Sequence, residues 1–278
     1  MKEFIDSNLK KSNLFGKDNK TIEIGLEQYK VTDIILDFLL ASKDKLKDNV
    51  VKGGISLVLH ETDTDKIPAR PTTDIDFHFY DERDWIDYSS NCIEVANKNS
   101  NLGITYMMEK EPKVTENGGR LYIIATKVQS VKFHIDMNYG VSVITDSIKG
   151  VNTYSVSTML TDKLSVVCSS KIRRRIKDLY DLYLLSSNNK FYLSDLVDNI
   201  TDRLNSKNIY ITSIWYLEKP ENMVEVKQAY NKFVSPVDIE FSTLIDKVTN
   251  FILLLVNIIS KKEEINVDRY WNGKEWVI

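Results

Sequence analysis

The sequence is poor in the residues that build disulfide-rich or zinc-centred proteins. Its 278 residues include only two cysteines, three histidines, five prolines and ten glycines. Cys92 and Cys168 stand in unrelated segments, which excludes a disulfide framework and indicates a reducing compartment. The histidines, at positions 60, 78 and 134, lack the spacing of metal ligands. We expect His78 and His134 to pack or to form hydrogen bonds, and not to catalyse.

Long apolar runs and a strong excess of one charge are also missing. The longest apolar stretch, Phe251–Ile259, is interrupted by Asn257 and is too short to span a bilayer. The opening segment MKEFIDSNLKK has no apolar run before a cleavage site, so no secretory signal is expected. A net charge of -3 argues against a generally basic surface for nucleic acid, but it is compatible with a local basic patch. We therefore expect a soluble cytoplasmic protein with no membrane partner.

The first half of the chain alternates helical and strand-like patterns. Apolar residues at helical spacing predict helices over residues 21–46, 55–60 and 82–99. Alternating or short apolar runs predict strands over residues 49–52, 73–79, 104–110, 120–126 and 131–139, and residues 61–70 read as a loop. Such alternation predicts an α/β (α+β) domain built on a mixed sheet.

From about Ser157 the pattern becomes helical throughout. Helices are predicted over residues 158–167, 173–185, 193–204 and 238–261, with no convincing strand between them. We place a domain boundary near residue 150, so that residues 1–150 form the sheet domain and residues 151–278 a helical domain. The aromatic tail, Tyr270 to Trp276, is predicted to be a docking strap, with a base-stacking platform as the alternative.

The segment Lys52-Gly53-Gly54-Ile55-Ser56 has the character of a phosphate-binding turn. A predicted strand ends in two glycines and a helix begins, so backbone N–H groups can approach an anion with no Cβ in the way. The Ser56 hydroxyl would add a further donor. A Gly-Gly pair before a helix is, on its own, more often a simple tight turn.

Asp74 and Asp76 form the second part of the pattern. They lie two residues apart on a predicted strand and therefore share one face of the sheet. Two such carboxylates repel and raise each other's pKa unless a cation lies between them, and their oxygens suit Mg²⁺. A lone Asp-x-Asp is more often a solvated pair. Its position after the glycine turn, with Arg70 four residues earlier, favours an enzyme that binds a nucleoside triphosphate.

Four stretches resemble the AbiEii/AbiGii toxin family of nucleotidyltransferases. The run KGGISLVLH…RPTTDIDF is similar to the first motif of that family, and KFHIDMNYG, residues 132–140, to its third-carboxylate strand. STMLTDKL, residues 157–164, and RIKDLYDL, residues 175–182, resemble two family helices. Together the matches span about residues 50–185.

The resemblance implies a role for each matching residue in the first half. Asp74, Asp76 and Asp136 would hold Mg²⁺ or Mn²⁺, and Asp136 could instead act as general base or simply end an edge strand. The other candidates would bind the phosphates of an NTP; they are Lys52, Gly53, Gly54, Ser56 and Arg70. Arg70 has the alternative of being an ordinary surface arginine.

In the second half the resemblance points to Lys163, Asp178 and Arg175. Lys163 lies among apolar residues, where it either contacts the triphosphate or extends to water. Asp178 would orient Lys163 or Arg175, and Asp181 would be structural. The basic run over residues 171–177 is either a solvated helix start or a contact surface for a polyanion such as RNA. Arg175 could instead make an internal contact with a phosphate of the nucleotide.

The resemblance implies a toxin of a bacterial toxin–antitoxin or abortive-infection system that transfers a nucleotide from an NTP to an acceptor. The resemblance makes the tRNA 3′ end one candidate acceptor and implies a cognate antitoxin with a winged-helix domain. Two alternatives stay open: a nucleotidyltransferase that modifies a small molecule or a protein, and a nucleotide-binding regulator without catalysis.

Overall fold

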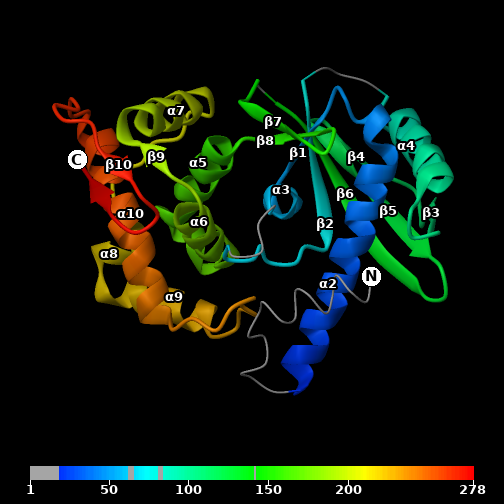
Figure 1. Ribbon diagram of the computed structural model, residues 1–278, viewed down its shortest axis with the longest axis horizontal. Helices are drawn as coiled ribbons and strands as arrows, with labels where there is room; N and C mark the ends of the chain where they lie inside the picture. Colours follow the sequence, from blue (N-terminus) through cyan, green and yellow to red (C-terminus); the bar gives the residue numbers. More distant parts are fainter. Residues whose placement is uncertain (1–18, 62–65, 81–83, 141) are drawn as a thin grey trace. The chain divides into compact units, whose positions relative to one another are not determined.

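The structure, a computed structural model, describes residues 19–61, 66–80, 84–140 and 142–278 (Figure 1). The opening segment MKEFIDSNLKK and Glu82, part of a predicted helix, lie outside the described residues. The chain divides into two compact units: residues 1–64 with 69–155, and residues 65–68 with 156–278.

The first unit is built on one mixed sheet. Its strands run in the order β3-β5-β6-β2-β1-β8-β7, with β4 also paired to β5. Their bounds are β1 Val50–Lys52, β2 Asp74–Phe79, β3 Thr105–Met108, β4 Lys113–Thr115, β5 Gly118–Thr126, β6 Ser130–Tyr139, β7 Thr145–Ile148 and β8 Val151–Tyr154. The β2–β6 and β1–β8 pairs are parallel and the other pairs antiparallel, which confirms the mixed sheet.

One face of this sheet is apolar and covered by helices. On β2, Ile75, Phe77 and Phe79 are buried, and they join one core with residues of α2 (Asn19–Ser42) and α4 (Trp85–Asn99). The Asp84 side chain caps α4 by accepting hydrogen bonds from Ile86 N and Asp87 N at 3.0 and 3.1 Å. Because side chains alternate along a strand, Asp74 and Asp76 lie on the opposite face.

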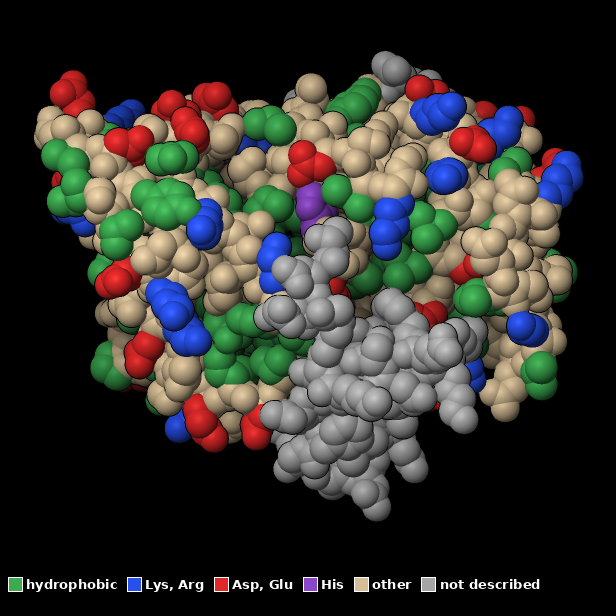
Figure 2. All heavy atoms as spheres, in the orientation of Figure 1, with side chains coloured by type: hydrophobic (Ala, Val, Ile, Leu, Met, Phe, Trp, Pro, Cys, Tyr) green, Lys and Arg blue, Asp and Glu red, His purple; other side chains and the backbone are tan. Residues whose placement is uncertain are grey.

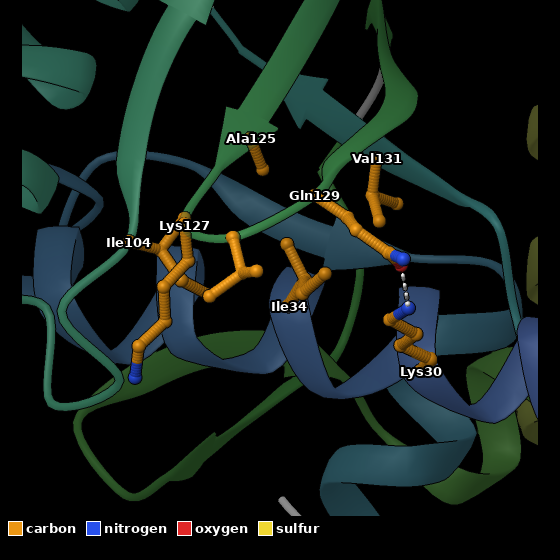
Figure 3. Close-up of a pocket in the computed structure, with 8 residues that line it drawn as sticks. Lys30, Ile34, Ile104, Ala125, Lys127, Gln129 and Val131 are labelled. Atoms are coloured by element: carbon orange, nitrogen blue, oxygen red, sulfur yellow. Dashed lines mark hydrogen bonds between the residues drawn. The ribbon is translucent and has the colours of Figure 1, made fainter.

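A small apolar cavity of about 210 Å³ lies between α2 and the hairpin of β5 and β6 (Figure 3). Its lining includes Ile34, Ala125 and Val131, and Lys30 Nζ donates a hydrogen bond to Gln129 Oε1 at 3.1 Å beside it. Ala125 and Val131 belong to the helix-covered side of the sheet, because Ala125 is buried there with the core. The cavity is therefore separate from the carboxylate face.

The second unit is mainly helical, with a small three-stranded sheet. Its elements are α5 Val156–Val167, the 3₁₀ turn η3 Ser170–Arg173, α6 Lys177–Asn188, α7 Leu193–Ser206, α8 Trp215–Glu218, α9 Pro220–Tyr230, α10 Phe241–Lys261, β9 Phe191–Tyr192, β10 Tyr270–Trp271 and β11 Trp276–Val277. The aromatic tail packs on α10: the Phe251 ring lies 4.8 Å from Trp271 and stacks on Trp276 at 5.7 Å, centroid to centroid. This confirms the predicted docking.

Several predictions made from the sequence need correction. The strands β4, β7, β8, β9, β10 and β11 were not predicted. Of these, β7 and β8 place residues 145–154 in the first unit's sheet. The helix expected from Arg173 begins at Lys177, because Ser170–Arg173 form a 3₁₀ turn.

The apolar stretch of residues 251–259 lies within the longer helix α10. Its 21 residues are long and apolar enough to cross a membrane by length and composition, the one such helix in the described part of the chain. Val248, Phe251 and Leu255 of α10 are fully buried in the protein, as in the core helix of a globular unit.

Candidate active site

The parallel register of β2 and β6 brings the three predicted carboxylates onto one face. Asp76 is paired with Asp136, and Asp74 with His134. Since residues two apart on a strand share a face, all four side chains point to the same side of the sheet. Asp74 and Asp136 are partly exposed, with 28% and 23% of their side chains accessible. The register therefore places these carboxylates as neighbours on one face of the sheet.

A row of four charged residues crosses the sheet at Asp76 and Asp136. Lys52 on β1 is paired with Asp76, and Arg120 on β5 with Asp136. Arg120 donates two hydrogen bonds to the Asp136 carboxylate, Nε to Oδ1 at 2.6 Å and Nη2 to Oδ2 at 2.8 Å. This contact, and more weakly the charge of Asp74, raise the pKa of the Arg120 guanidinium. A cation thus stands at each end of an acidic pair.

Arg120 was not among the residues singled out from the sequence. Its strand was predicted, and the alternation along it puts Arg120 and Tyr122 on one face. The missing information was the register, because only the pairing of β5 with β6 shows that Arg120 meets Asp136.

The two histidines of this face differ in surroundings. His134 Nε2 lies 3.8 Å from Asp74 Oδ2 and 3.7 Å from Asp136 Oδ2, so its ring lies near both carboxylates. His78 is buried and its Nδ1 is hydrogen-bonded to Tyr154 Oη at 3.0 Å. The hydrogen-bonding role expected for His78 is confirmed.

The glycine turn packs directly against the aspartate strand. Gly53 has φ 75°, and a Cβ there would overlap Asp76 Oδ2. A Cβ on Gly54 would stand 2.9 Å from Thr72 Oγ1 and 3.0 Å from Arg70 Nη1. Only glycines allow this close approach of turn and carboxylate. Lys52 and Gly53 thus lie beside Asp76, and Arg70 lies beside Gly54.

The side chains of Arg70 and Ser56 are more buried than the sequence suggested. Arg70 is 7% exposed, so the alternative of a surface arginine is wrong. Ser56 is fully buried and its hydroxyl is hydrogen-bonded to Thr153 Oγ1 of β8. The Ser56 side chain therefore faces the interior of the first unit and is not displayed at its surface.

Lys163, Asp178 and Arg175 belong to the second unit, where they form a cluster with Asp181. Lys163 Nζ lies 2.6 Å from Asp178 Oδ1 and 2.7 Å from Asp181 Oδ2, with both carboxylates fully buried. Arg175 Nε lies 2.7 Å from Asp178 Oδ2 and its side chain is half exposed. Asp178 orients both cations, and Lys163 does not extend to water. Asp181, predicted to be only structural, shares the lysine.

The donor set on the sheet fits a hard divalent ion by its chemistry, since carboxylate oxygens are the ligands that Mg²⁺ prefers. The carboxylates are not yet gathered: no three acidic, histidine or cysteine side chains of the described residues are grouped closely enough to hold a metal. One oxygen of Asp74 accepts a hydrogen bond from Thr72 Oγ1 at 2.9 Å, and Asp136 is held by Arg120.

Two solved structures are similar to this chain at low sequence identity. A crystal structure described as "putative nucleotidyltransferase from H. pylori" is 15% identical, with a TM-score of 0.53 over 87% of this chain and 99% of that one. A second, JHP933 from Helicobacter pylori, is 18% identical with a TM-score of 0.48 over 86% and 93% of the two chains. A search of curated proteins found no significant match.

The family model "Nucleotidyl transferase AbiEii toxin, Type IV TA system" matches residues 37–249, well over half of the chain. This range contains the glycine turn, the aspartate strand, the strand of Asp136 and the cluster around Lys163. The resemblance inferred from the motifs is thereby confirmed. The chain belongs to the AbiEii family of nucleotidyltransferase toxins of type IV toxin–antitoxin systems.

Proposed function

We propose that this nucleotidyltransferase uses Mg²⁺, held by Asp74, Asp76 and Asp136, to transfer a nucleotide from an NTP to an acceptor hydroxyl. The observation that carries the proposal is the register of β2 and β6, which sets Asp76 beside Asp136 with Asp74 on the same face. Mn²⁺ has the same ligand preference and would substitute. Bound there, the ion would neutralise charge on the triphosphate and on the attacking oxygen.

The residues around the carboxylates supply binding and orientation. The turn of Gly53 and Gly54 packs against Asp76 and Arg70 because neither glycine carries a Cβ, and its backbone N–H groups would bind phosphate oxygens. Lys52, paired with Asp76, and Arg70, packed on Gly54, bring positive charge to the triphosphate. Asp136 is either the third ligand or the base that accepts the proton of the acceptor hydroxyl.

We assign Lys163, Asp178 and Arg175 to the same reaction as the contribution of the second unit. Asp178 holds the Lys163 ammonium and the Arg175 guanidinium at 2.6 and 2.7 Å. A buried lysine between two carboxylates is held in a fixed position, and Arg175 leaves part of its guanidinium exposed for a phosphate. Their motif is one of those that carry the family resemblance.

For the acceptor we propose RNA, with the tRNA 3′ end as the site of addition. Support comes from the basic run over residues 171–177, in which Lys171, Arg173, Arg174 and Arg175 are all exposed. Exposed cations at this density suit a phosphate backbone. The family implies a cognate antitoxin, and we propose one with a winged-helix domain.

The test uses the four labelled NTPs, total RNA and cell lysate, with Asp76→Asn beside wild type. The variant keeps the shape of Asp76 but loses a charge that a divalent ion needs, so label should fall by roughly 100-fold or more. Asp44→Asn, an exposed aspartate of the 3₁₀ turn Lys43–Lys45, is the matched control and should retain transfer.

The outcomes separate the alternatives. Label in RNA, located by sequencing tRNA 3′ ends, supports the proposal. Label in protein or in a small molecule favours the first alternative acceptor class. Growth arrest that Asp76→Asn leaves unchanged, with NTP still bound, favours the regulator without catalysis.

A further inference from the structure

We infer that Arg120 occupies the third metal ligand, Asp136, and so makes metal binding depend on the arrival of the NTP. The inference rests on the proposed function, because it concerns the same carboxylates. Arg120 has no role in the motifs that identify the family. Its position is fixed by the pairing of Gly118–Thr126 with Ser130–Tyr139, which sets it opposite Asp136.

The contact itself is a two-pronged one. Arg120 Nε and Nη2 lie 2.6 and 2.8 Å from the two oxygens of Asp136, so both oxygens of that carboxylate are engaged. A guanidinium matches a carboxylate in this planar geometry better than any other side chain does. We call this pair of hydrogen bonds from Arg120 to Asp136 the fork. A cation that binds Asp136 must therefore displace the fork or share a carboxylate oxygen with Arg120.

The row Lys52, Asp76, Asp136 and Arg120 is balanced in charge while Arg120 is bonded to Asp136, and Asp74 adds a further carboxylate to the same face. Asp76 and Asp136 are direct neighbours, with Lys52 and Arg120 at the two ends of the row. A divalent ion entering alone would meet the Arg120 charge next to the ligand that it needs. An NTP brings its own negative charge, which attracts both the ion and the guanidinium. The ion and the NTP then bind together.

Arg120 is able to make such a move. Its side chain is 42% exposed, whereas Asp136 is 23% exposed and fixed on a central strand. The fork uses Nε and Nη2 of a group that has five N–H donors, so the guanidinium can turn toward a phosphate without leaving the site. Arg120 thus acts as a positioning residue, through Asp136.

The experiment measures Mn²⁺ binding to the full chain without NTP, by the EPR signal of free Mn²⁺. Arg120→Gln should bind Mn²⁺ about tenfold more tightly than wild type, because a unit charge beside the ion has been removed. Arg120→Lys keeps the charge but loses the fork, so its affinity should fall between the two. Both variants alter a half-exposed side chain, and circular dichroism checks that the fold is kept.

Lys132→Gln is the matched control for a general change of charge. Lys132 lies on the same strand and face as Asp136, four residues away, and contacts Glu109. Four residues of a strand span roughly 13 Å, beyond the Debye length of about 8 Å at physiological salt. Its Mn²⁺ affinity should stay within about twofold of wild type.

Equal or weaker Mn²⁺ binding by Arg120→Gln overturns the inference, as does a failure of both proteins to bind. The single variant Asp76→Asn, measured alongside Arg120→Gln, separates this result from a failure of the proposed function. If Asp76→Asn leaves Mn²⁺ binding unchanged, the ion is elsewhere and both ideas are wrong. If Asp76→Asn abolishes binding while Arg120→Gln has no effect, only the inference about Arg120 is wrong.

Discussion

The carboxylate of Asp76 lies directly against Gly53, so that a methyl group on Gly53 would overlap Asp76 Oδ2. Gly53 also has φ 75° and ψ -149°, a conformation that side-chain-bearing residues rarely adopt. One glycine therefore satisfies two constraints: the turn at the end of β1 and the position of an acidic residue on β2. A side chain on Gly53 should therefore lower stability through the backbone conformation and lower activity through displacement of Asp76.

Gly53→Ala should lower the free energy of unfolding by about 1–3 kcal/mol and nucleotidyl transfer by roughly 100-fold. The first effect follows from the backbone, and the second from displacement of Asp76. Gly103→Ala is the control, since Gly103 has φ 63° but open space around its missing Cβ. Urea unfolding and transfer of labelled NTP would be measured on both. A similar loss of activity in the two variants would contradict the steric explanation.

Asp33 on α2 provides a prediction about pH. It is 7% exposed, its Oδ2 has no hydrogen-bond partner among the described residues, and burial raises its pKa to about 7. The unfolded carboxyl has a pKa near 3.9, so between about pH 4 and 7 the folded state holds a proton that the unfolded state has lost. This contribution to stability is complete below pH 4 and is lost as the pH rises through 7.

Asp33→Asn should therefore gain stability relative to wild type by about 2–3 kcal/mol between pH 5 and pH 8. Urea unfolding at a series of pH values measures the difference. Asp37→Asn is a contrasting control: Asp37 is equally buried but accepts hydrogen bonds from Ser100, Tyr106 and two backbone N–H groups. At pH 8 it should lose about 1–3 kcal/mol. A parallel pH profile for Asp33→Asn and wild type would count against the prediction.

The sequence alone was sufficient for the parts of the site that depend on local periodicity. The alternation over Asp74–Phe79 and Ser130–Tyr139 gives the face of every side chain on both strands, including the three carboxylates. The glycine turn is also local, because its geometry depends on the missing Cβ of Gly53 and Gly54. These features were predicted because they require no knowledge of which strands are neighbours.

The remaining features depend on tertiary partners. Arg120 becomes part of the site only through the register with Asp136, and Arg70 is buried against Gly54. Ser56 looked suited to a phosphate, but β8 supplies Thr153 as its partner inside the first unit. The strand β7 is short and largely polar, so its pairing with β8 outweighs a weak local preference.

Lys163→Met should destabilise the protein by about 3–5 kcal/mol, because it leaves Asp178 and Asp181 buried with less compensating charge. The control, Lys98→Met, removes a lysine from an exposed pair with Glu94 at 2.6 Å and should cost less than about 1 kcal/mol. Adding Asp178→Asn and Asp181→Asn to Lys163→Met should restore more than half of the loss. If Lys163→Met unfolded with the same free energy as wild type, the cluster would contribute little to stability.

Arg174 offers a test of the proposed RNA contact that does not touch the carboxylates. Arg174→Gln should weaken binding of total tRNA and reduce the slope of log affinity against log salt by about one, the expected effect of losing one phosphate contact. Arg173→Gln should change the slope less, since its guanidinium is paired with Glu225 at 2.9 Å and lies over the Trp215 ring. Lys98→Gln, which removes an exposed charge from α4 of the first unit, should leave the slope unchanged. Filter binding between about 50 and 200 mM salt resolves a slope difference of this size, because each phosphate contact then changes affinity about threefold. If all three variants shared the wild-type slope, the basic run would be a solvated surface and RNA would have to be held elsewhere.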